Sequence, residues 1–315
     1  VAGAPYAGAT TGAITFVGAF AADAAFATDV FELRTTGAVA DSANVLDFST
    51  STSDVVVRAG TTVDLDTAAH DFNTVSISAG TTVTLNDTNG LTVGTVDTQN
   101  GIATGGGQVD VTAGGALVVA HQVTNTGANN INLTGVGIDL STTNSDVGSG
   151  TGIITIDAGT GLFNMASGSS VATTTADIDV SSDTIALAGL IQTTTVGEIS
   201  LAPDTASTVI SLGAGATTGF ALTDAELNTL DATIVRIGDA TTGAPWGGAS
   251  TGAITWTGAF AADSAFATDL LALTTTSTVT GTAGVIDFST SGSDLVIRGA
   301  SSGVNLGTAA HDFNT

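Results

Sequence analysis

The chain has 315 residues, 29 of them acidic and only 4 basic, which gives a formal net charge of -25. It contains no cysteine, which excludes disulfides, a thiol nucleophile and thiolate metal sites. Lysine is also absent, so the chain lacks the basic stripe that binds phosphate backbones, and we expect no nucleic-acid partner. No apolar run approaches the roughly 18 residues of a membrane-spanning helix, so we expect no membrane span.

The amino-terminal region returns near the carboxyl end. Residues 3–58 match residues 243–298 at a constant offset of 240, with 36 of the 56 aligned positions identical. After one inserted residue, the segment TAAHDFNT of residues 67–74 recurs at 308–315. We interpret residues 1–240 as one full unit of a tandem array and residues 241–315 as the start of the next copy, with no separate globular domain.

Within this unit, short alternating segments such as VDV, INL and ISL predict brief strands of valine and isoleucine. Two interleaved series recur every 21–25 residues, which we interpret as two strands per coil. They start at Val109, Ile131, Ile154, Ile178 and Ile199, and at Leu117, Ile138, Leu162, Ile185 and Ile210. Nearer the amino terminus the spacing shortens to 18 or 20 residues, in the series Val45, Val63, Val83 and the series Val55, Val75, Val93.

These spacings predict an all-β fold, a parallel β-helix (β-solenoid) with coils of about 18–25 residues. One coil cannot bury its own apolar face, but coils stacked about 4.8 Å apart bury a continuous core. Aromatic residues make up only 5% of the chain, which suits a narrow interior of small aliphatic side chains. At about 18–25 residues a coil, the 315 residues would form about 14 coils. A string of antiparallel sandwiches is the competing architecture, although no linker marks a domain edge.

One segment departs from the strand pattern. Thr223 is followed three residues later by Glu226, ahead of Leu227 and Leu230, which is the pattern of a capping box. We therefore expect a short helical decoration near residues 223–230. The segment GAFAADAAFATD, residues 18–29, fits either a helix or strands.

Three runs of residues carry a family resemblance. They are LTDAELNTLDATIVRIGDATTGAPWGGASTGAITWTGAF, GLTVGTVDTQNGIATGGGQVDVTAGGALVV and DIDVSSDTIALAGLI. In repeat style the chain resembles filamentous-haemagglutinin-like giant exoproteins. The resemblance implies export across a bacterial envelope, a right-handed parallel β-helix shaft, and a role in adhesion, aggregation or an extracellular filament. Neither an Asn-Pro-Asn-Gly secretion signature nor an Arg-Gly-Asp motif occurs, so no secretion or receptor-binding residue carries over.

The repeat identifies structural and surface candidates. His70 and His311 lie in equivalent TAAHDFNT segments, each followed by aspartate. Without a neighbouring nucleophile, we interpret both histidines as hydrogen-bonded corners. Tyr6, Trp246 and Trp256 are the only tyrosine and tryptophans. Because each has an aromatic equivalent in the other copy, we interpret them as packing or surface features of a shaft, and no catalytic residue is assigned.

Calcium is the one cofactor that the acidic composition suggests. Calcium prefers clustered oxygen ligands, and Asp64 and Asp66 share one strand face, with Asp110 in the near-match GGGQVD. In the second copy Asn305 and Gly307 replace the first two aspartates. We therefore expect weak calcium binding at most, and no dedicated metal or cofactor site.

These observations predict a non-enzymatic structural segment of a giant repetitive exported protein, forming an extracellular fibre or adhesin shaft on a bacterial cell surface. A self-polymerising filament or sheath subunit is the alternative, with other copies of the repeat stacked end to end as its partners. A surface or glycan receptor would be the partner of an adhesin. More distant alternatives are a β-helix polysaccharide-active enzyme and an ice-binding surface of threonine ladders.

Overall fold

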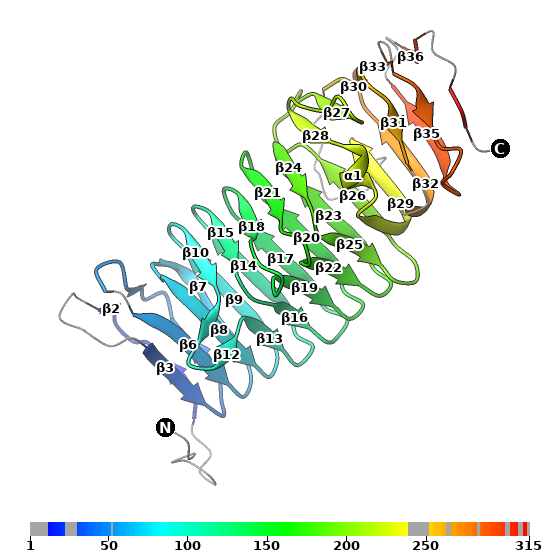
Figure 1. The fold of residues 1–315 in the computed structure, drawn as a ribbon. Helices are drawn as coiled ribbons and strands as arrows, with labels where there is room; N and C mark the ends of the chain where they lie inside the picture. The colour runs from blue at the N-terminus through cyan, green and yellow to red at the C-terminus, as the bar shows by residue number, and fades with distance from the viewer. Residues whose placement is uncertain are drawn as a thin grey trace.

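The computed structural model describes residues 12–22, 30–51, 53–238, 252–262, 266–281, 284–299, 303–307 and 311–313. These residues form a β-solenoid of about 11 stacked coils, built almost entirely from parallel strands (Figure 1). The predicted all-β parallel β-helix is therefore confirmed. Tyr6 and Trp246 lie outside the described residues, as does most of the ambiguous segment 18–29.

Each regular coil has three strands, one on each of three faces, which we number in chain order. Face 1 contains β1 (Ile14–Thr15), β4 (Val39–Ala40), β7 (Val63–His70), β9 (Val83–Asp87), β14 (Val109–Ala113), β17 (Ile131–Thr134), β20 (Ile154–Asp157), β23 (Ile178–Ser181) and β26 (Glu198–Ala202). Face 2 contains β10 (Leu91–Val93), β15 (Leu117–Val119), β18 (Ile138–Leu140), β21 (Leu162–Met165) and β24 (Thr184–Leu187). Before them, β2 (Phe20–Ala21) and β5 (Leu46–Asp47) hold the same place in chain order.

Face 3 contains β3 (Val30–Thr35), β6 (Asp54–Ala59), β8 (Thr74–Ala79), β13 (Ile102–Thr104), β16 (Val123–Asn125), β19 (Asp146–Ser149), β22 (Ser170–Thr173) and β25 (Leu190–Thr193). Two strands per coil were predicted, so that interpretation was wrong. After β8 the strands of face 3 carry little apolar sequence: in β16 (Val-Thr-Asn) the two buried residues are Val123 and the polar Asn125. Polar flanking residues hide the alternation on which the prediction depended.

The core consists of stacked columns of one small apolar side chain per coil. On face 1 the column has no exposed surface in six consecutive coils, at Val83, Val109, Ile131, Ile154, Ile178 and Ile199. The next residue is partly exposed in the first four of these coils, whereas Asp179 and Ser200 are buried. Because burying one such side chain stabilises the fold by roughly 1.5–3 kcal/mol, every added coil strengthens its neighbours.

The register differs in detail from the predicted series. Phe163, not Leu162, stacks between Ile138 and Ile185, because β21 starts one residue before its inward position. Val45 is likewise outside the face-1 column, which Val39 occupies. Steps along face 1 are 20–26 residues long up to Ile199 and then lengthen to 36 residues. The longer steps explain why the chain forms fewer coils than the predicted 14.

Residues 203–229 interrupt the regular coils. β28 (Phe220–Leu222) contacts β24 and pairs in parallel with β27 (Ile210–Leu212), which precedes it in the chain. The chain thus turns back once and places two strands of one coil on face 2. The predicted short helix is confirmed as α1 (Asp224–Leu227), with Thr223 as its N-cap and a complete capping box.

After α1, two long strands wrap from face 3 onto face 1. They are β29 (Leu230–Gly238) and β32 (Ala267–Thr274), and β35 (Asp294–Arg298) stacks next on face 1. Face 2 continues from β27 through β30 (Ile254–Trp256), β33 (Val279–Gly281) and β36 (Val304–Asn305). A separate pair joins β31 (Phe260–Ala261) and β34 (Ile286–Asp287).

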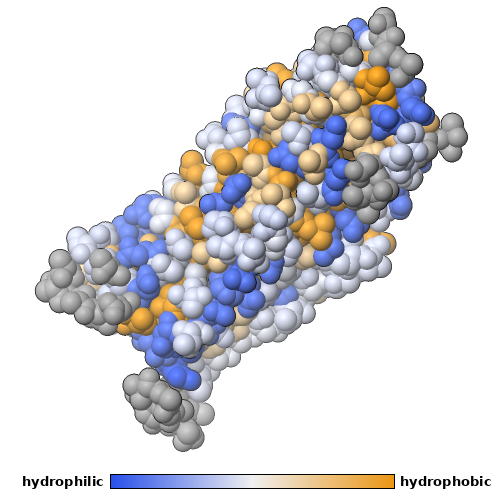
Figure 2. Space-filling model, viewed as in Figure 1, coloured by the Kyte–Doolittle hydropathy of each residue, from blue (hydrophilic) through white to orange (hydrophobic). Residues whose placement is uncertain are grey.

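One hairpin decorates the outside of face 3. β11 (Thr95–Val96) and β12 (Gln99–Asn100) form an antiparallel pair inserted between β10 and β13. The hairpin covers β8, so that Val56 and Ser76, which would otherwise point into solvent, have no exposed surface. Hydrophilic and hydrophobic residues are mixed along the visible face of the rod (Figure 2).

Candidate functional site

A buried histidine–aspartate pair forms the most polar point of the core. His70 and Asp41 have no exposed side-chain surface, and His70 Nε2 lies 3.0 Å from Asp41 Oδ2. His70 Nδ1 accepts the backbone N–H of Leu46 at 2.9 Å. Because Nδ1 is an acceptor, the neutral imidazole carries its proton on Nε2 and donates it to the carboxylate. Ala43 N–H and the backbone and hydroxyl of Thr67 also donate to Asp41.

The electrostatics of this pair favour a structural role. Burial lowers the pKa of His70 and outweighs the opposing effect of the hydrogen bond and charge of Asp41. A neutral imidazole that already has a partner for each ring nitrogen, with no solvent access, has no site for a substrate. The geometry agrees with a hydrogen-bonded corner, which is how we interpreted His70 from the sequence.

The second copy fills the same corner with different residues. Gly281 stands where Asp41 stands in the first copy, and Trp256 replaces Phe16. A Cβ atom on Gly281 would lie 2.3 Å from the indole of Trp256, so this ring occupies the space of the missing side chain. His311 Nε2 instead lies 2.8 Å from the carbonyl of Leu306. Trp256 is 1% exposed and is therefore a core residue rather than a surface platform.

The three calcium candidates do not converge on one point. Asp64 and Asp110 lie in one outward column of face 1, but Thr84 lies between them. Two coil steps separate their carboxylates by about 10 Å, too far for both to bind one ion. Asp66 lies beside Asp64, and burial together with Asp64 raises the pKa of Asp66. Among the residues that the structure describes, no group of three or more His, Cys, Asp and Glu has the arrangement of a metal site.

A second acidic cluster lies further along face 1, and the sequence did not reveal it. Asp179 is 5% exposed, and burial, followed by the nearby charges of Asp177 and Glu198, raises the pKa of Asp179 to about 7. Glu198 is paired with Arg236, whose Nη2 lies 2.8 Å from Glu198 Oε2. The arginine therefore neutralises Glu198 and leaves Asp179 without a cation of its own.

The hairpin β11–β12 is held to the rod by an arginine. Arg58 Nη2 donates to the carbonyl of Asp97 at 2.9 Å, and Arg58 Nη1 lies 2.6 Å from Glu32 Oε1. Asp97 and Thr98 form the turn with positive φ of 44° and 64°. This turn has no glycine or asparagine, so the usual hairpin signature was missing from the sequence.

Two runs of three threonines, residues 173–175 and 193–195, lie at a corner of the solenoid rather than across a flat face. Thr173 pairs with Thr193 in register, and the N–H of Thr194 donates to the carbonyl of Thr173. Thr173 and Thr193 are buried, and the stacked runs extend over these two coils. A threonine ladder on a broad surface, as an ice-binding function needs, is not formed by these runs.

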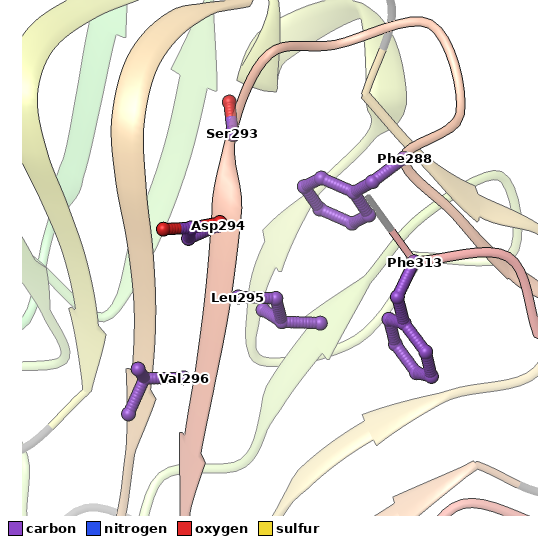
Figure 3. A pocket seen from close by; sticks show the side chains of 6 residues that line it. All are labelled: Phe288, Ser293, Asp294, Leu295, Val296 and Phe313. Atoms are coloured by element: carbon purple, nitrogen blue, oxygen red, sulfur yellow. The ribbon is translucent and has the colours of Figure 1, made fainter. Parts of the chain in front are cut away.

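The last described coil contains a small cavity of ≈ 330 Å³ with a mixed polar and apolar lining. Phe288, Leu295 and Phe313 point into it, whereas Asp294 and Val296 point away (Figure 3). Phe288 is as fully buried as its equivalent Phe48, but Leu295 is partly exposed, whereas its equivalent Val55 is 1% exposed because β8 stacks on β6. The cavity therefore lies at the position that β8 covers in the first copy.

Comparison with known proteins does not assign the chain to a family. No protein family, curated protein or solved structure matches the chain. No helix among the described residues combines the length and apolar character that crossing a membrane requires.

Proposed function

We propose that the chain is a non-enzymatic segment of a rigid extracellular shaft, displayed at a bacterial surface by a longer repetitive protein. The observation that carries this proposal is the unbroken stacking of about 11 coils around one apolar core. Each coil bonds to the coils before and after it through backbone ladders, so a load along the axis is shared by parallel hydrogen bonds. The resemblance to filamentous-haemagglutinin-like exoproteins supports the exported location.

The surface chemistry fits a shaft better than a catalyst. The strongest polar cluster of the core, around Asp41 and His70, is closed to solvent. The acidic surface keeps neighbouring rods apart, since the net charge is -25. A polysaccharide-active enzyme would require paired carboxylates in an open cleft. Turnover of an acidic polysaccharide by the purified chain, abolished by a carboxylate substitution, would contradict the proposal.

A self-assembling filament subunit is the second candidate, because every coil of the rod stacks on its neighbours through parallel backbone ladders. Ladders of the same kind can join one copy of the repeat to another molecule. Analytical ultracentrifugation of the purified chain separates the two candidates. Concentration-dependent growth of long oligomers favours the filament, and a monomer at all concentrations favours the passive shaft.

The proposed location is tested by immunogold electron microscopy of intact, unpermeabilised source cells with an antibody against this chain. We expect gold particles in lines that project from the cell surface. Labelling that appears only after permeabilisation would contradict an extracellular shaft.

A further inference from the structure

The two copies of the long repeat lie on different faces of the solenoid. Ile14 is on face 1, where β1 pairs with β4. Its equivalent at offset 240, Ile254, pairs with Ile210 and Val279 on face 2. Figure 1 shows β30 and β33 continuing the row of β24 and β28 rather than the row of β26 and β29.

A second strand of the repeat changes face in the same direction. Phe31 belongs to face 3, where β3 pairs with β6. Its equivalent, Leu271, pairs with Val235 and Leu295 on face 1. Since face 1 follows face 3 along the chain, both equivalents have moved forward by one face. Two independent ladders thus report the same displacement.

The displacement can be counted along face 1. From Ile14 the ladder makes nine steps, through Val39, Val63, Val83, Val109, Ile131, Ile154, Ile178, Ile199 and Val235. The chain then passes to face 2 and reaches Ile254. One unit of 240 residues therefore corresponds to nine coils and one additional face.

We infer that successive copies of the 240-residue repeat meet one face out of phase, so that each copy presents the same outer surface on the next face of the rod. The partner in this interface is the next copy of the same unit. In a tandem array, three consecutive units would present any outward residue of the repeat on all three faces. A receptor or neighbouring fibre could then bind the shaft from every side. This consequence rests on the proposed shaft, whereas the phase itself does not.

A strand of the repeat fits either face because its alternation of inward apolar and outward polar residues is the same on both. Val39 and its equivalent Val279 are both 0% exposed, on face 1 and face 2 respectively. In both copies an apolar residue points inward and a polar or small residue points outward. Each face is built from short strands with the same alternation, so identical sequences fit different faces.

Introduced cysteines can test the phase, because the chain has no natural cysteine. Thr255 is the register partner of Ser211 in the structure. If the copies were in phase, Thr255 would instead stack on Arg236, as its equivalent Thr15 belongs to the face-1 column. The double variants S211C/T255C and R236C/T255C therefore distinguish the two arrangements. Dibromobimane, which fluoresces when it bridges two adjacent thiols, is the probe.

The matched control is T15C/A40C, a register pair from the first copy of the same strand. We expect S211C/T255C to reach the fluorescence of the control, and R236C/T255C to remain at the level of single-cysteine variants. Bridging of R236C/T255C without bridging of S211C/T255C would overturn the inference. So would absence of bridging in both and in the face-1 pair I234C/L270C described next, while the control reacts.

A second double-cysteine variant is needed in case the probe reaches the thiol at residue 211 poorly. Ile234 and Leu270 are register partners on face 1 and are both partly exposed. The variant I234C/L270C should also bridge, and peptide mass spectrometry should identify the linked strands. Failure of this pair contradicts the phase even if the fold is intact by circular dichroism. Because location and binding play no part in the readout, its failure is distinct from failure of the proposed function.

Discussion

Three residues of the corner around His70 change together between the two copies. Phe16, Asp41 and Asn44 in the first copy become Trp256, Gly281 and Gly284 in the second. The larger indole fills the space of the absent carboxyl group, and its Nε1 lies 3.4 Å from the carbonyl of Gly284. The corner therefore has two solutions that both fill the volume and give the histidine a hydrogen-bond partner.

We predict that these exchanges are strongly coupled. The single substitution Asp41→Gly should destabilise the chain by about 1–3 kcal/mol, because His70 Nε2 loses its carboxylate acceptor. Phe16→Trp alone should cost a similar amount through overpacking. The triple variant F16W/D41G/N44G should lie within about 1 kcal/mol of the wild type. Urea unfolding measures the three free energies, and additive losses would refute the coupling.

Because the pKa of Asp179 is raised, we predict that replacing Asp179 with asparagine stabilises the chain more at high pH than at low pH. The ordinary pKa is 3.8 and the folded value is about 7, so between these values the folded state binds the proton more tightly. Wild-type stability therefore falls as pH rises through this window, and stays at the reduced level above it. Asp179→Asn avoids the loss and should stabilise the chain at pH 8 by about 2–4 kcal/mol more than at pH 4.

Denaturant unfolding at the two pH values measures this effect. Asp139→Asn is the matched control, since Asp139 also points outward and is partly exposed on face 2. The control should show a smaller difference between the two pH values. An equal effect of both substitutions at both pH values would show that Asp179 titrates normally.

At the scale of the secondary-structure elements, α1 connects two parts of the rod that the regular ladders do not join. Glu226 Oε1 accepts the N–H of Leu187 in β24 at 3.0 Å, and Asp224 Oδ1 accepts the N–H of Ala261 in β31 at 3.1 Å. The helix is only four residues long and could not be stable alone. These contacts and the buried Leu227 hold it in place.

Loss of the capping carboxylate should loosen this connection. Glu226 Oε2 accepts from both the N–H and the hydroxyl of Thr223 at 2.8 Å. We expect Glu226→Ala to cost about 1–3 kcal/mol, since it also leaves the Leu187 N–H without that acceptor. Glu226→Gln keeps an amide oxygen and should cost less. Hydrogen exchange at Leu187 measures the local effect; equal protection in both variants would contradict it.

The turn of the hairpin β11–β12 stores backbone strain that glycine would relieve. Thr98 is β-branched and has a φ of 64°, a conformation that such residues rarely adopt. Thr98→Gly should stabilise the hairpin by about 1 kcal/mol, whereas Thr98→Ala should gain less. The Gly101 N–H donates to the carbonyl of Gly94 at the base of the hairpin, and its protection against hydrogen exchange reports the change. Lower protection in the glycine variant would show that the turn is unstrained.

The elements differ in how far the sequence predicted them. Face 1 and the capping box were found because their signals are local: alternating valine and isoleucine, and threonine three residues before glutamate. The predicted series included Val55 and Val75 of face 3, but in the later coils this face was missed because strands such as β16 carry one apolar residue between polar corners. Asp41 could not be assigned to His70, since 29 residues separate them and their contact depends on the register of adjacent coils.

At the scale of the whole molecule, one apolar core runs from β1 to β35 without a boundary between the two copies. About 11 coils at about 4.8 Å each give a rod on the order of 50 Å long. The predicted long unit is therefore a unit of sequence rather than a folding domain. One unit fills nine coils and one additional face. The stacking therefore continues without a break into the next copy, whose outward residues lie on the next face.

The central claim is that this chain forms part of a continuous rigid shaft, and cryo-electron microscopy of the native material that contains it is the most direct test. We predict unbranched rods of constant width, with an axial repeat of about 4.8 Å continuing through successive copies of the unit. Globular particles, or beads joined by flexible linkers, would contradict the account.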